Sequence, residues 1–252
     1  MTGLESMYIA DFRHGQRWEG DGCVVELRVS EELRVPGQAA VRPSVLFTLA
    51  DVGAGMVANR LTDRIALTVD LALRCFRPVE LDRVVIDSRL VKAGRNTIVT
   101  ESWLSSEPGA EPVGVAYGTF IQSPREGDAK VSREGSFAAE DPLFSAPFAE
   151  QLGAVVAAPG VVELARHPYV LQPTGTLQGG TVGLLVELAA HSLTGRPVGD
   201  LEVRFLTTVR QGPARTSASV LGAGLVRVEV RDTGNANRLA ALGLVRLAEP
   251  PG

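Results

Sequence analysis

Two acidic residues stand alone inside apolar, helix-like runs, where a carboxylate could do chemistry. Asp51 lies in the run 45–61, and Glu187 lies in the run 182–193. A carboxylate at such a place can act as a general base or as a nucleophile. From periodicity alone, Asp51 fits the polar stripe of an amphipathic helix equally well. Glu187 and His191, four residues apart, predict an ordinary hydrogen-bonded pair, since no third ligand has the spacing of a metal site.

A glycine pair, Gly179-Gly180, directly precedes the second apolar run. Main-chain amides at a helix N-terminus can stabilise a developing negative charge, because the helix dipole is positive there. Glycine also lets a bound group approach the backbone closely, since it has no Cβ. Taken alone, the pair also suits a plain turn before a helix.

The elements that must position these residues occur twice along the chain. The matching segments are VVEL at 24–27 and 161–164, DLALRCF at 70–76 and DLEVRFL at 200–206, and Ala-Gly at 93–94 and 223–224. In each half, the apolar run stands between the first and the second of these segments. Offsets that stay near 130 residues throughout predict a tandem duplication.

Within each half, the pattern predicts one strand, one helix and then a series of strands. The later strands are expected at 65–76, 84–91, 97–104 and 113–121, and at 200–209, 214–221, 225–231 and 239–247. A helix this apolar cannot lie on a solvated surface, so a curved antiparallel sheet must wrap around it, in an α+β fold. We expect a first domain at 1–124, a linker rich in charge, Ser, Gly and Pro at 125–146, and a second domain at 147–252.

The composition argues against several classes of protein. The net charge is −4, and the 25 Lys and Arg residues are scattered singly, which does not suit a nucleic-acid binder. No apolar run reaches about 18 residues, and no basic segment followed by an apolar core begins the chain, so we expect a cytoplasmic protein without a membrane partner. Cys23 and Cys75 are expected to be buried reduced thiols, and the sequence predicts no metal and no cofactor.

Four motifs, in this order and spacing, are typical of one known family. They are LFTLAD at 46–51, TVDLALRCFRP at 68–78, VKAGRNT at 91–97 and GTLQGGTVGLLVE at 175–187. They resemble the hotdog-fold thioesterases, specifically the phenylacetate-pathway type and its 4-hydroxybenzoyl-CoA relatives. The resemblance implies a tandem double hotdog with sites between the units. Each site would take a glycine amide and an upstream amide side chain from one unit, and an acid and a hydroxyl from the other.

Carried onto this sequence, the resemblance implies two unequal sites. One site would collect Asp51, Thr68, Gln172 and Gly179, and the other would collect Glu187, Val198, Pro36 and Pro43. Proline has no N–H, so Pro43 cannot donate to an oxyanion as the Gly179 amide can. Val198 likewise has no hydroxyl to match that of Thr68. We therefore predict one competent site and one degenerate site.

In the competent site, each residue has an expected role. Asp51 would act as general base on water, or as nucleophile through an anhydride, and Thr68 would orient the carboxylate or the water. The Gly179 amide would polarise the thioester carbonyl, and Gln172 would hold it. Further substrate contacts are expected from Gly55, Gly180 and Arg95. Small residues after Asp51 would leave room for an acyl group, whereas the arginine either meets a CoA phosphate or is a solvated turn residue.

The resemblance implies a thioesterase acting on an acyl-CoA or another carrier-bound thioester. Two alternatives stay open. One is a non-catalytic acyl-ligand-binding protein, since Gln178 stands where many relatives carry His. The other is a hotdog dehydratase or hydratase, which would need a histidine beside Asp51. The expected partner is the thioester substrate alone, with further pairing into a homo-oligomer left open.

Overall fold

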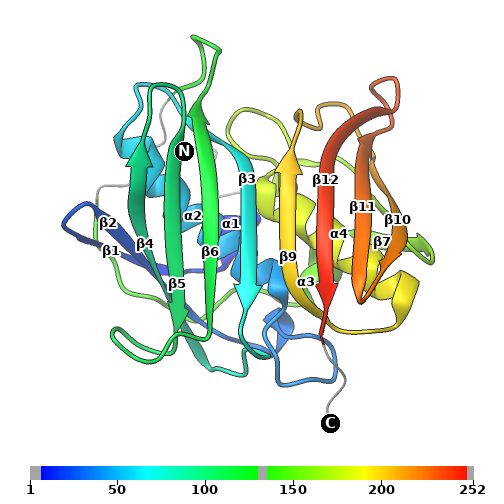
Figure 1. Cartoon of the computed structure of the whole chain (residues 1–252), viewed down its shortest axis with the longest axis horizontal. Coiled ribbons are helices and arrows are strands. Elements are labelled where there is room, and N and C mark those ends of the chain that lie inside the picture. The colour runs from blue at the N-terminus through cyan, green and yellow to red at the C-terminus, as the bar shows by residue number, and fades with distance from the viewer. Residues whose placement is uncertain (1–6, 130–134, 249–252) are drawn as a thin grey trace.

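The computed structural model describes residues 7–129 and 135–248. Within these residues, the strands form one twelve-stranded sheet in which all neighbours are antiparallel, and the two long helices lie on one face of it (Figure 1). Part of the expected linker, 130–134, and the ends of the expected domains, 1–6 and 249–252, lie outside the described residues. None of the described helices is long and apolar enough to span a membrane.

The elements follow the same order in both halves of the chain. The first half contains α1 (Tyr8–Asp11), β1 (Gly15–Glu19), β2 (Gly22–Arg28), a 3-10 turn (Glu31–Leu33), α2 (Pro43–Arg60), β3 (Ala66–Cys75), β4 (Arg83–Ala93), β5 (Ile98–Ser105) and β6 (Gly114–Gln122). The second half contains α3 (Phe148–Gln151), β7 (Ala154–Ala158), β8 (Val161–Leu164), a 3-10 turn (Pro168–Val170), α4 (Gly179–Thr194), β9 (Val198–Phe205), β10 (Ala214–Gly222), β11 (Leu225–Asp232) and β12 (Arg238–Leu247).

The expectation of a single strand before each long helix is wrong. A hairpin precedes each helix instead, formed by β1 with β2 and by β7 with β8. The outer strand of each hairpin lies at an edge of the sheet, and the residues of β7 are mostly exposed. Because an edge strand is paired on one side only and buries little, its sequence carries a weak strand signal.

The strand order runs in the same sense from both edges of the sheet toward its centre. It is β1-β2-β4-β5-β6-β3 in the first half, continued by β9-β12-β11-β10-β8-β7 in the second. The halves meet where β3 pairs with β9, with Leu73 opposite Leu201 and Asp70 opposite Arg204. The expected α+β class, with a curved antiparallel sheet around an apolar helix in each half, is confirmed.

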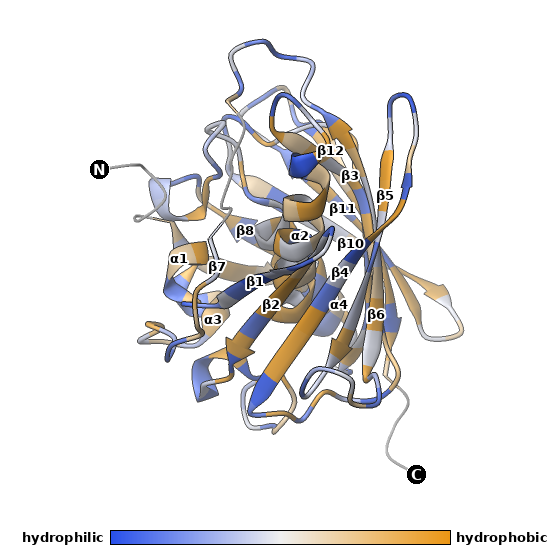
Figure 2. Ribbon diagram, turned by 90° about the vertical axis from the view of Figure 1, so that its left-hand side faces the viewer, coloured by the Kyte–Doolittle hydropathy of each residue, from blue (hydrophilic) through white to orange (hydrophobic). Residues whose placement is uncertain are grey.

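The two long helices form the centre of the molecule. Both α2 and α4 are apolar around most of their circumference, because each packs against the sheet on one side and against the other helix on another. Figure 2 shows hydrophobic residues along α2 and along the strands beside it. One core cluster includes side chains from both halves, such as Phe47 and Leu185. Burial of this shared core holds the halves together.

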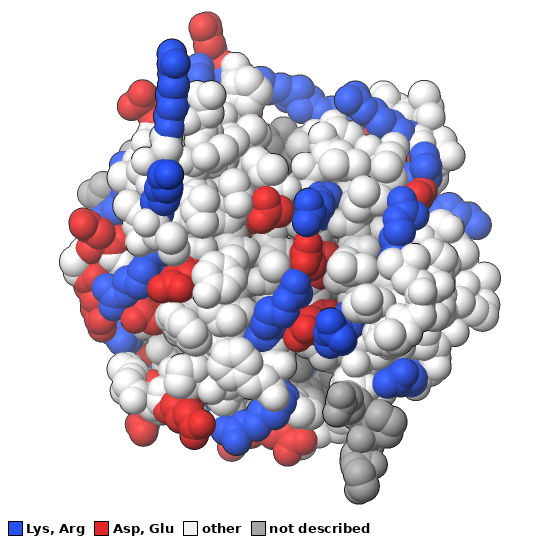
Figure 3. Space-filling view, viewed as in Figure 1, with Lys and Arg blue, Asp and Glu red and all other residues white. Residues whose placement is uncertain are grey.

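The outer face of the sheet carries mixed charge. Lys and Arg alternate with Asp and Glu across it, without a large region of one sign (Figure 3). Over the junction of β3 and β9, Arg74 pairs with Glu202 at 2.6 Å and Arg246 pairs with Asp200 at 3.5 Å. Such exposed or half-buried ion pairs contribute little to stability. The cavity of the protein lies on the other side of the sheet, where the helices pack.

Candidate active site

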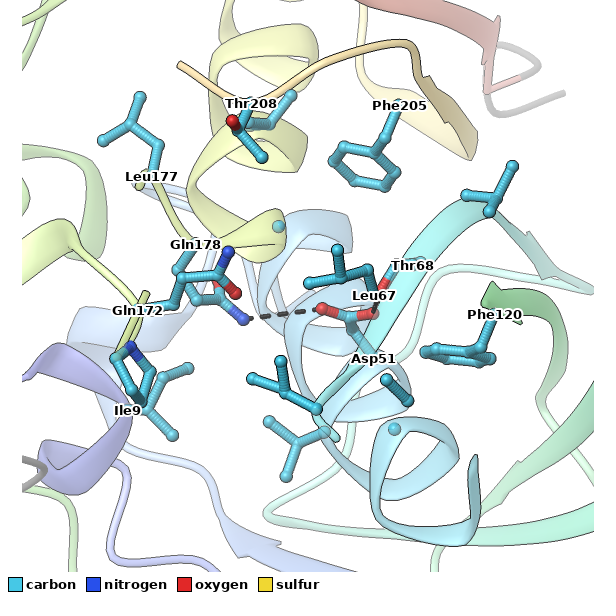
Figure 4. A pocket seen from close by; sticks show the side chains of 18 of the residues that line it. Ile9, Asp51, Leu67, Thr68, Phe120, Gln172, Leu177, Gln178, Phe205 and Thr208 are labelled. Atoms are coloured by element: carbon cyan, nitrogen blue, oxygen red, sulfur yellow. Dashed lines mark hydrogen bonds between the residues drawn. The ribbon is translucent and has the colours of Figure 1, made fainter. Parts of the chain in front are cut away.

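A cavity of about 330 Å³ lies between the two halves, beside α2 and at the start of α4 (Figure 4). Residues from both halves line it. Its apolar walls include Met56, Ile65, Phe120, Val182, Phe205 and Val209. Beside Asp51 the lining is polar, because Thr68 and Gln178 contact its carboxylate, so the cavity is suited to a ligand with an apolar body and a polar, reactive group.

Asp51 projects from α2 into this cavity and is held by Thr68. The Thr68 hydroxyl donates to Asp51 Oδ1 at 2.7 Å. A β-bulge between Thr68 and Asp70 aims this hydroxyl inward. Without the extra residue, strand alternation would place Thr68 on the face opposite the buried Leu71. The bulge therefore brings the hydroxyl to the carboxylate.

The environment of Asp51 changes its acidity. Burial raises the pKa of the Asp51 carboxyl from 3.8 to about 6, and the hydrogen bond from Thr68 acts against this rise. Desolvation disfavours the charged form, while a donated hydrogen bond favours it. A carboxyl with this pKa is ionised at neutral pH and still basic enough to accept a proton from water in a transition state.

The first residue of α4, Gly179, faces the same carboxylate. A Cβ built on Gly179 would lie 2.8 Å from Asp51 Oδ2, so only glycine permits this approach. In the part of the chain that the structure describes, no group accepts a hydrogen bond from the Gly179 amide. A free amide at a helix N-terminus and a carboxylate from the other half thus meet at the cavity.

Gln178 completes this cluster, and the sequence analysis missed it as a site residue. It caps α4, where its side-chain Oε1 accepts from the amides of Gly180 at 2.5 Å and Thr181 at 3.3 Å. Its Nε2 lies 3.5 Å from Asp51 Oδ2, across the cavity in Figure 4. Its position in the sequence, immediately before the apolar helical run, could have identified it, because a side-chain oxygen there can accept from the first amides of the helix.

Of the other residues expected to contact the substrate, two line the cavity and two do not. Gln172 lines the cavity, and its Nε2 donates to Thr176 Oγ1 at 2.6 Å. Gly55 also lines the cavity, one helical turn after Asp51. Gly180 does not, because it packs directly against Thr48 where the two helices touch. Arg95 lies in the exposed turn between β4 and β5 and is not part of the cavity wall.

The residues expected at a second, degenerate site make a different arrangement. Glu187 Oε1 pairs with Arg42 Nη2 at 2.8 Å, and the two side chains are only 4% and 5% exposed. Its Oε2 accepts the Ser44 amide at 2.8 Å, at the start of α2. Arg42 thus stands before α2 as Gln178 stands before α4. Both oxygens of this carboxylate are used in joining the helices.

Of the remaining members of that set, Pro43 directly precedes Ser44, whose amide donates to Glu187. Pro43 begins α2, Pro36 lies in the exposed loop before it, and Val198 begins β9. The expected pair of Glu187 with His191 is wrong. The His191 ring contacts the carbonyl of Arg196 at 3.0 Å instead, because the buried arginine already occupies the carboxylate. Among the described residues, no cluster of three or more His, Cys, Asp or Glu could hold a metal ion.

The family model described as Thioesterase superfamily matches residues 43–113, from α2 through β5. No curated protein matches the chain.

Solved structures are similar over nearly the whole chain. An acyl-ACP thioesterase from Bacteroides thetaiotaomicron is 11% identical, with 90% of this chain and 98% of that chain covered and a TM-score of 0.63. A 12:0-ACP thioesterase from Umbellularia californica is 8% identical, with 92% and 99% covered and a TM-score of 0.65. A tesB protein from Mycobacterium avium subs paratuberculosis is 12% identical, with 97% and 98% covered and a TM-score of 0.61. The resemblance to the thioesterase superfamily is thus confirmed over residues 43–113, and the chain as a whole has the double hotdog fold.

Proposed function

We propose that this protein hydrolyses an acyl-CoA, or an acyl group on a related carrier, at the cavity between its halves. The observation that carries the proposal is the convergence of the Asp51 carboxylate and the free Gly179 amide in a largely apolar cavity. The match to the thioesterase superfamily supports the reaction class. The similar fold of two acyl-ACP thioesterases supports a thioester substrate.

The proposed reaction uses these groups in one sequence. Asp51 takes a proton from water as the water oxygen bonds to the thioester carbonyl carbon. The Gly179 amide stabilises the resulting oxyanion. The carbonyl re-forms, the C–S bond breaks, and the thiolate receives the proton held by Asp51. The products are a carboxylic acid and a free thiol, so every atom of the water and the thioester is accounted for.

The chain itself we infer to be two hotdog units joined in tandem, at 1–124 and 147–252, with the linker at 125–146. The matching motifs and the mirrored strand order support this division. The pairing of Glu187 with Arg42 supports a single site for each chain, because that carboxylate is neutralised and both its oxygens are engaged.

A panel of acyl-CoA and acyl-pantetheine thioesters, assayed with a free-thiol reagent, tests the proposal. Thiol release that depends on Asp51 is the expected result. The protein's own thiols should react slowly, because burial raises the pKa of Cys23 and of the half-buried Cys75 to about 12. Tight acyl-CoA binding without thiol release across the panel would favour an acyl-ligand-binding protein instead.

One observation favours a second candidate, a hydratase or dehydratase. His14 is buried and lines the same cavity as Asp51. Such a pair could add water across the double bond of an enoyl thioester, with one group activating the water and the other protonating the adjacent carbon. Loss of the enoyl absorbance without thiol release, abolished in His14→Ala, would identify this activity.

Replacing Thr68 by valine tests the hydroxyl that holds the carboxylate. The wild-type kcat/KM is expected to rise with pH through an inflection near 6, as Asp51 ionises. Since the Thr68 hydrogen bond lowers the pKa of Asp51, Thr68→Val should move the inflection to higher pH and lower kcat/KM at pH 7. Thr68→Ser, which keeps the hydroxyl, is the matched control. An unmoved inflection in the valine variant would contradict the assigned role.

Replacing Gly179 by alanine tests the close approach at the helix start. The new Cβ would meet Asp51 Oδ2 at 2.8 Å and Phe205 Cζ at 3.4 Å, so the carboxylate must move. A shift of a reacting group by about 1 Å costs about 10²-fold in rate. Gly199→Ala is the control, because Gly199 is not part of the cavity lining and its Cβ would come no closer than 3.5 Å to other atoms. Equal kcat/KM in the two alanine variants would refute the role of Gly179.

A further inference from the structure

Tyr8 lies behind the candidate site, in a buried aromatic cluster contributed by both halves. The residue belongs to the short helix α1 and is completely buried. Its ring lies 5.9 Å from that of Phe148 and 6.2 Å from that of Tyr169, centroid to centroid. These aromatic contacts hold the Tyr8 hydroxyl in one place. That hydroxyl donates a hydrogen bond to Oε1 of Gln178.

The Gln178 oxygen therefore accepts from three donors at once. They are the Tyr8 hydroxyl and the amides of Gly180 and Thr181. A glutamine amide turned by 180° would present its NH₂ group to the two main-chain amides and lose both of those bonds, and the Tyr8 hydroxyl would have to accept instead of donate. The observed orientation is thus strongly preferred, and it directs Nε2 toward Asp51 Oδ2 and the cavity (Figure 4).

We propose that Tyr8 is a positioning residue, which sets the Gln178 amide so that Nε2 serves as a second donor beside the Gly179 amide. This inference rests on the proposed thioester hydrolysis. The Nε2 group carries two hydrogens, and its 3.5 Å contact with Asp51 is long. One hydrogen is thus available to the oxyanion of the substrate, while the other supports the ionised carboxylate.

Two features of Tyr8 suit it to this task. Burial raises the pKa of its phenol well above the ordinary value, so the hydroxyl remains a donor across the working range of pH. Tyr8 also belongs to the first half of the chain, whereas Gln178 caps α4 in the second half. The orientation of the amide therefore depends on correct docking of α1 against the other half.

The experiment compares Tyr8→Phe with Tyr169→Phe, both alone and combined with Gln178→Ala. Tyr169 belongs to the same aromatic cluster, but its hydroxyl donates to Asp11 instead of Gln178. Tyr8→Phe is expected to lower kcat/KM roughly tenfold, the effect of one hydrogen bond, and Tyr169→Phe to change it little. In the Gln178→Ala background, Tyr8→Phe should have no further effect, because the two residues act in series.

A second readout does not require turnover. The carboxyl of Asp51 can be titrated by NMR in the full-length protein. The ionisable groups near it are His14, which lines the same cavity, and Tyr8, which lies behind the site. Tyr8→Phe should raise the pKa of Asp51, because the Gln178 side chain is then held by the two main-chain amides alone and its Nε2 supports the ionised carboxylate less firmly. Gln178→Ala removes the same donor while leaving Tyr8 in place, so it should also raise the pKa of Asp51, and Tyr8→Phe should add no further shift in that background.

Two results would overturn the inference. One is an equal effect of Tyr8→Phe and Tyr169→Phe on kcat/KM and on the Asp51 titration. The other is a full Tyr8→Phe effect that persists in the Gln178→Ala background. Failure of the proposed function looks different: the wild-type protein would release no thiol, or Asp51→Asn would release it as fast, while the titration still reports on Tyr8.

Discussion

Asp51→Asn is expected to lower kcat/KM for acyl thioester hydrolysis by about 10²- to 10⁴-fold, the contribution typical of a positioned general base. Asparagine is nearly the same size and can still accept the Thr68 hydrogen bond, so the geometry of the site should persist. The negative charge is removed, and with it the ability to take a proton from water or to attack the thioester carbon. Steady-state thiol release with the best substrate of the panel measures the effect.

Single-turnover hydrolysis in ¹⁸O-labelled water separates the two ways in which Asp51 could act. A general base places the label in the acid product, whereas an anhydride opened by water at the Asp51 carbonyl carbon leaves the label in the Asp51 carboxyl and gives an unlabelled product in that first turnover. Thiol release by Asp51→Asn within a few-fold of wild type would reject both roles.

The same variant should be more stable than the wild type above pH 6. The folded protein holds the Asp51 proton more tightly than the unfolded chain does, since the pKa is about 6 when folded and 3.8 ordinarily. Ionisation of the buried carboxyl therefore costs stability as the pH rises from about 4 to 6, and the full cost persists at higher pH. Thermal melts of both proteins should diverge over that range and coincide below it.

Glu187→Ala is expected to differ from Asp51→Asn in both respects. It should lose much of its stability and little of its activity. Removing one partner of a buried ion pair costs about 3–5 kcal/mol, because the Arg42 charge is left buried without its carboxylate. The Ser44 amide also loses its acceptor. Urea unfolding should show the loss, while kcat/KM measured well below the melting temperature should remain close to that of wild type.

The double variant Arg42→Met with Glu187→Leu is the control for this prediction. Apolar side chains of similar length remove both charges together, and such replacements are often neutral or stabilising. The double variant should recover most of the lost stability. If Glu187→Ala instead reduced thiol release as strongly as Asp51→Asn does, the carboxylate would be part of a working second site, and the single-site proposal would fail.

Much of the fold was visible in local sequence pattern. The long helices begin within three residues of the apolar runs that predicted them, and the eight later strands lie within two residues of their expected starts. Helical and strand periodicities are properties of neighbouring residues, so a single sequence can reveal them. The outer hairpin strands β1 and β7 were missed because each is only five residues long and neither alternates between buried and exposed residues.

The grouping of Asp51 and Thr68 with Gly179 was predicted through the internal repeat and the family resemblance, and their catalytic roles remain proposals. Other features depended on tertiary structure alone. The bulge that turns Thr68 inward, the Arg42–Glu187 pair and the contact of Tyr8 with Gln178 leave no trace in local pattern. The last two join residues more than 140 positions apart. Such contacts exist only once both helices and the sheet have packed, because packing decides which polar groups meet when water is excluded.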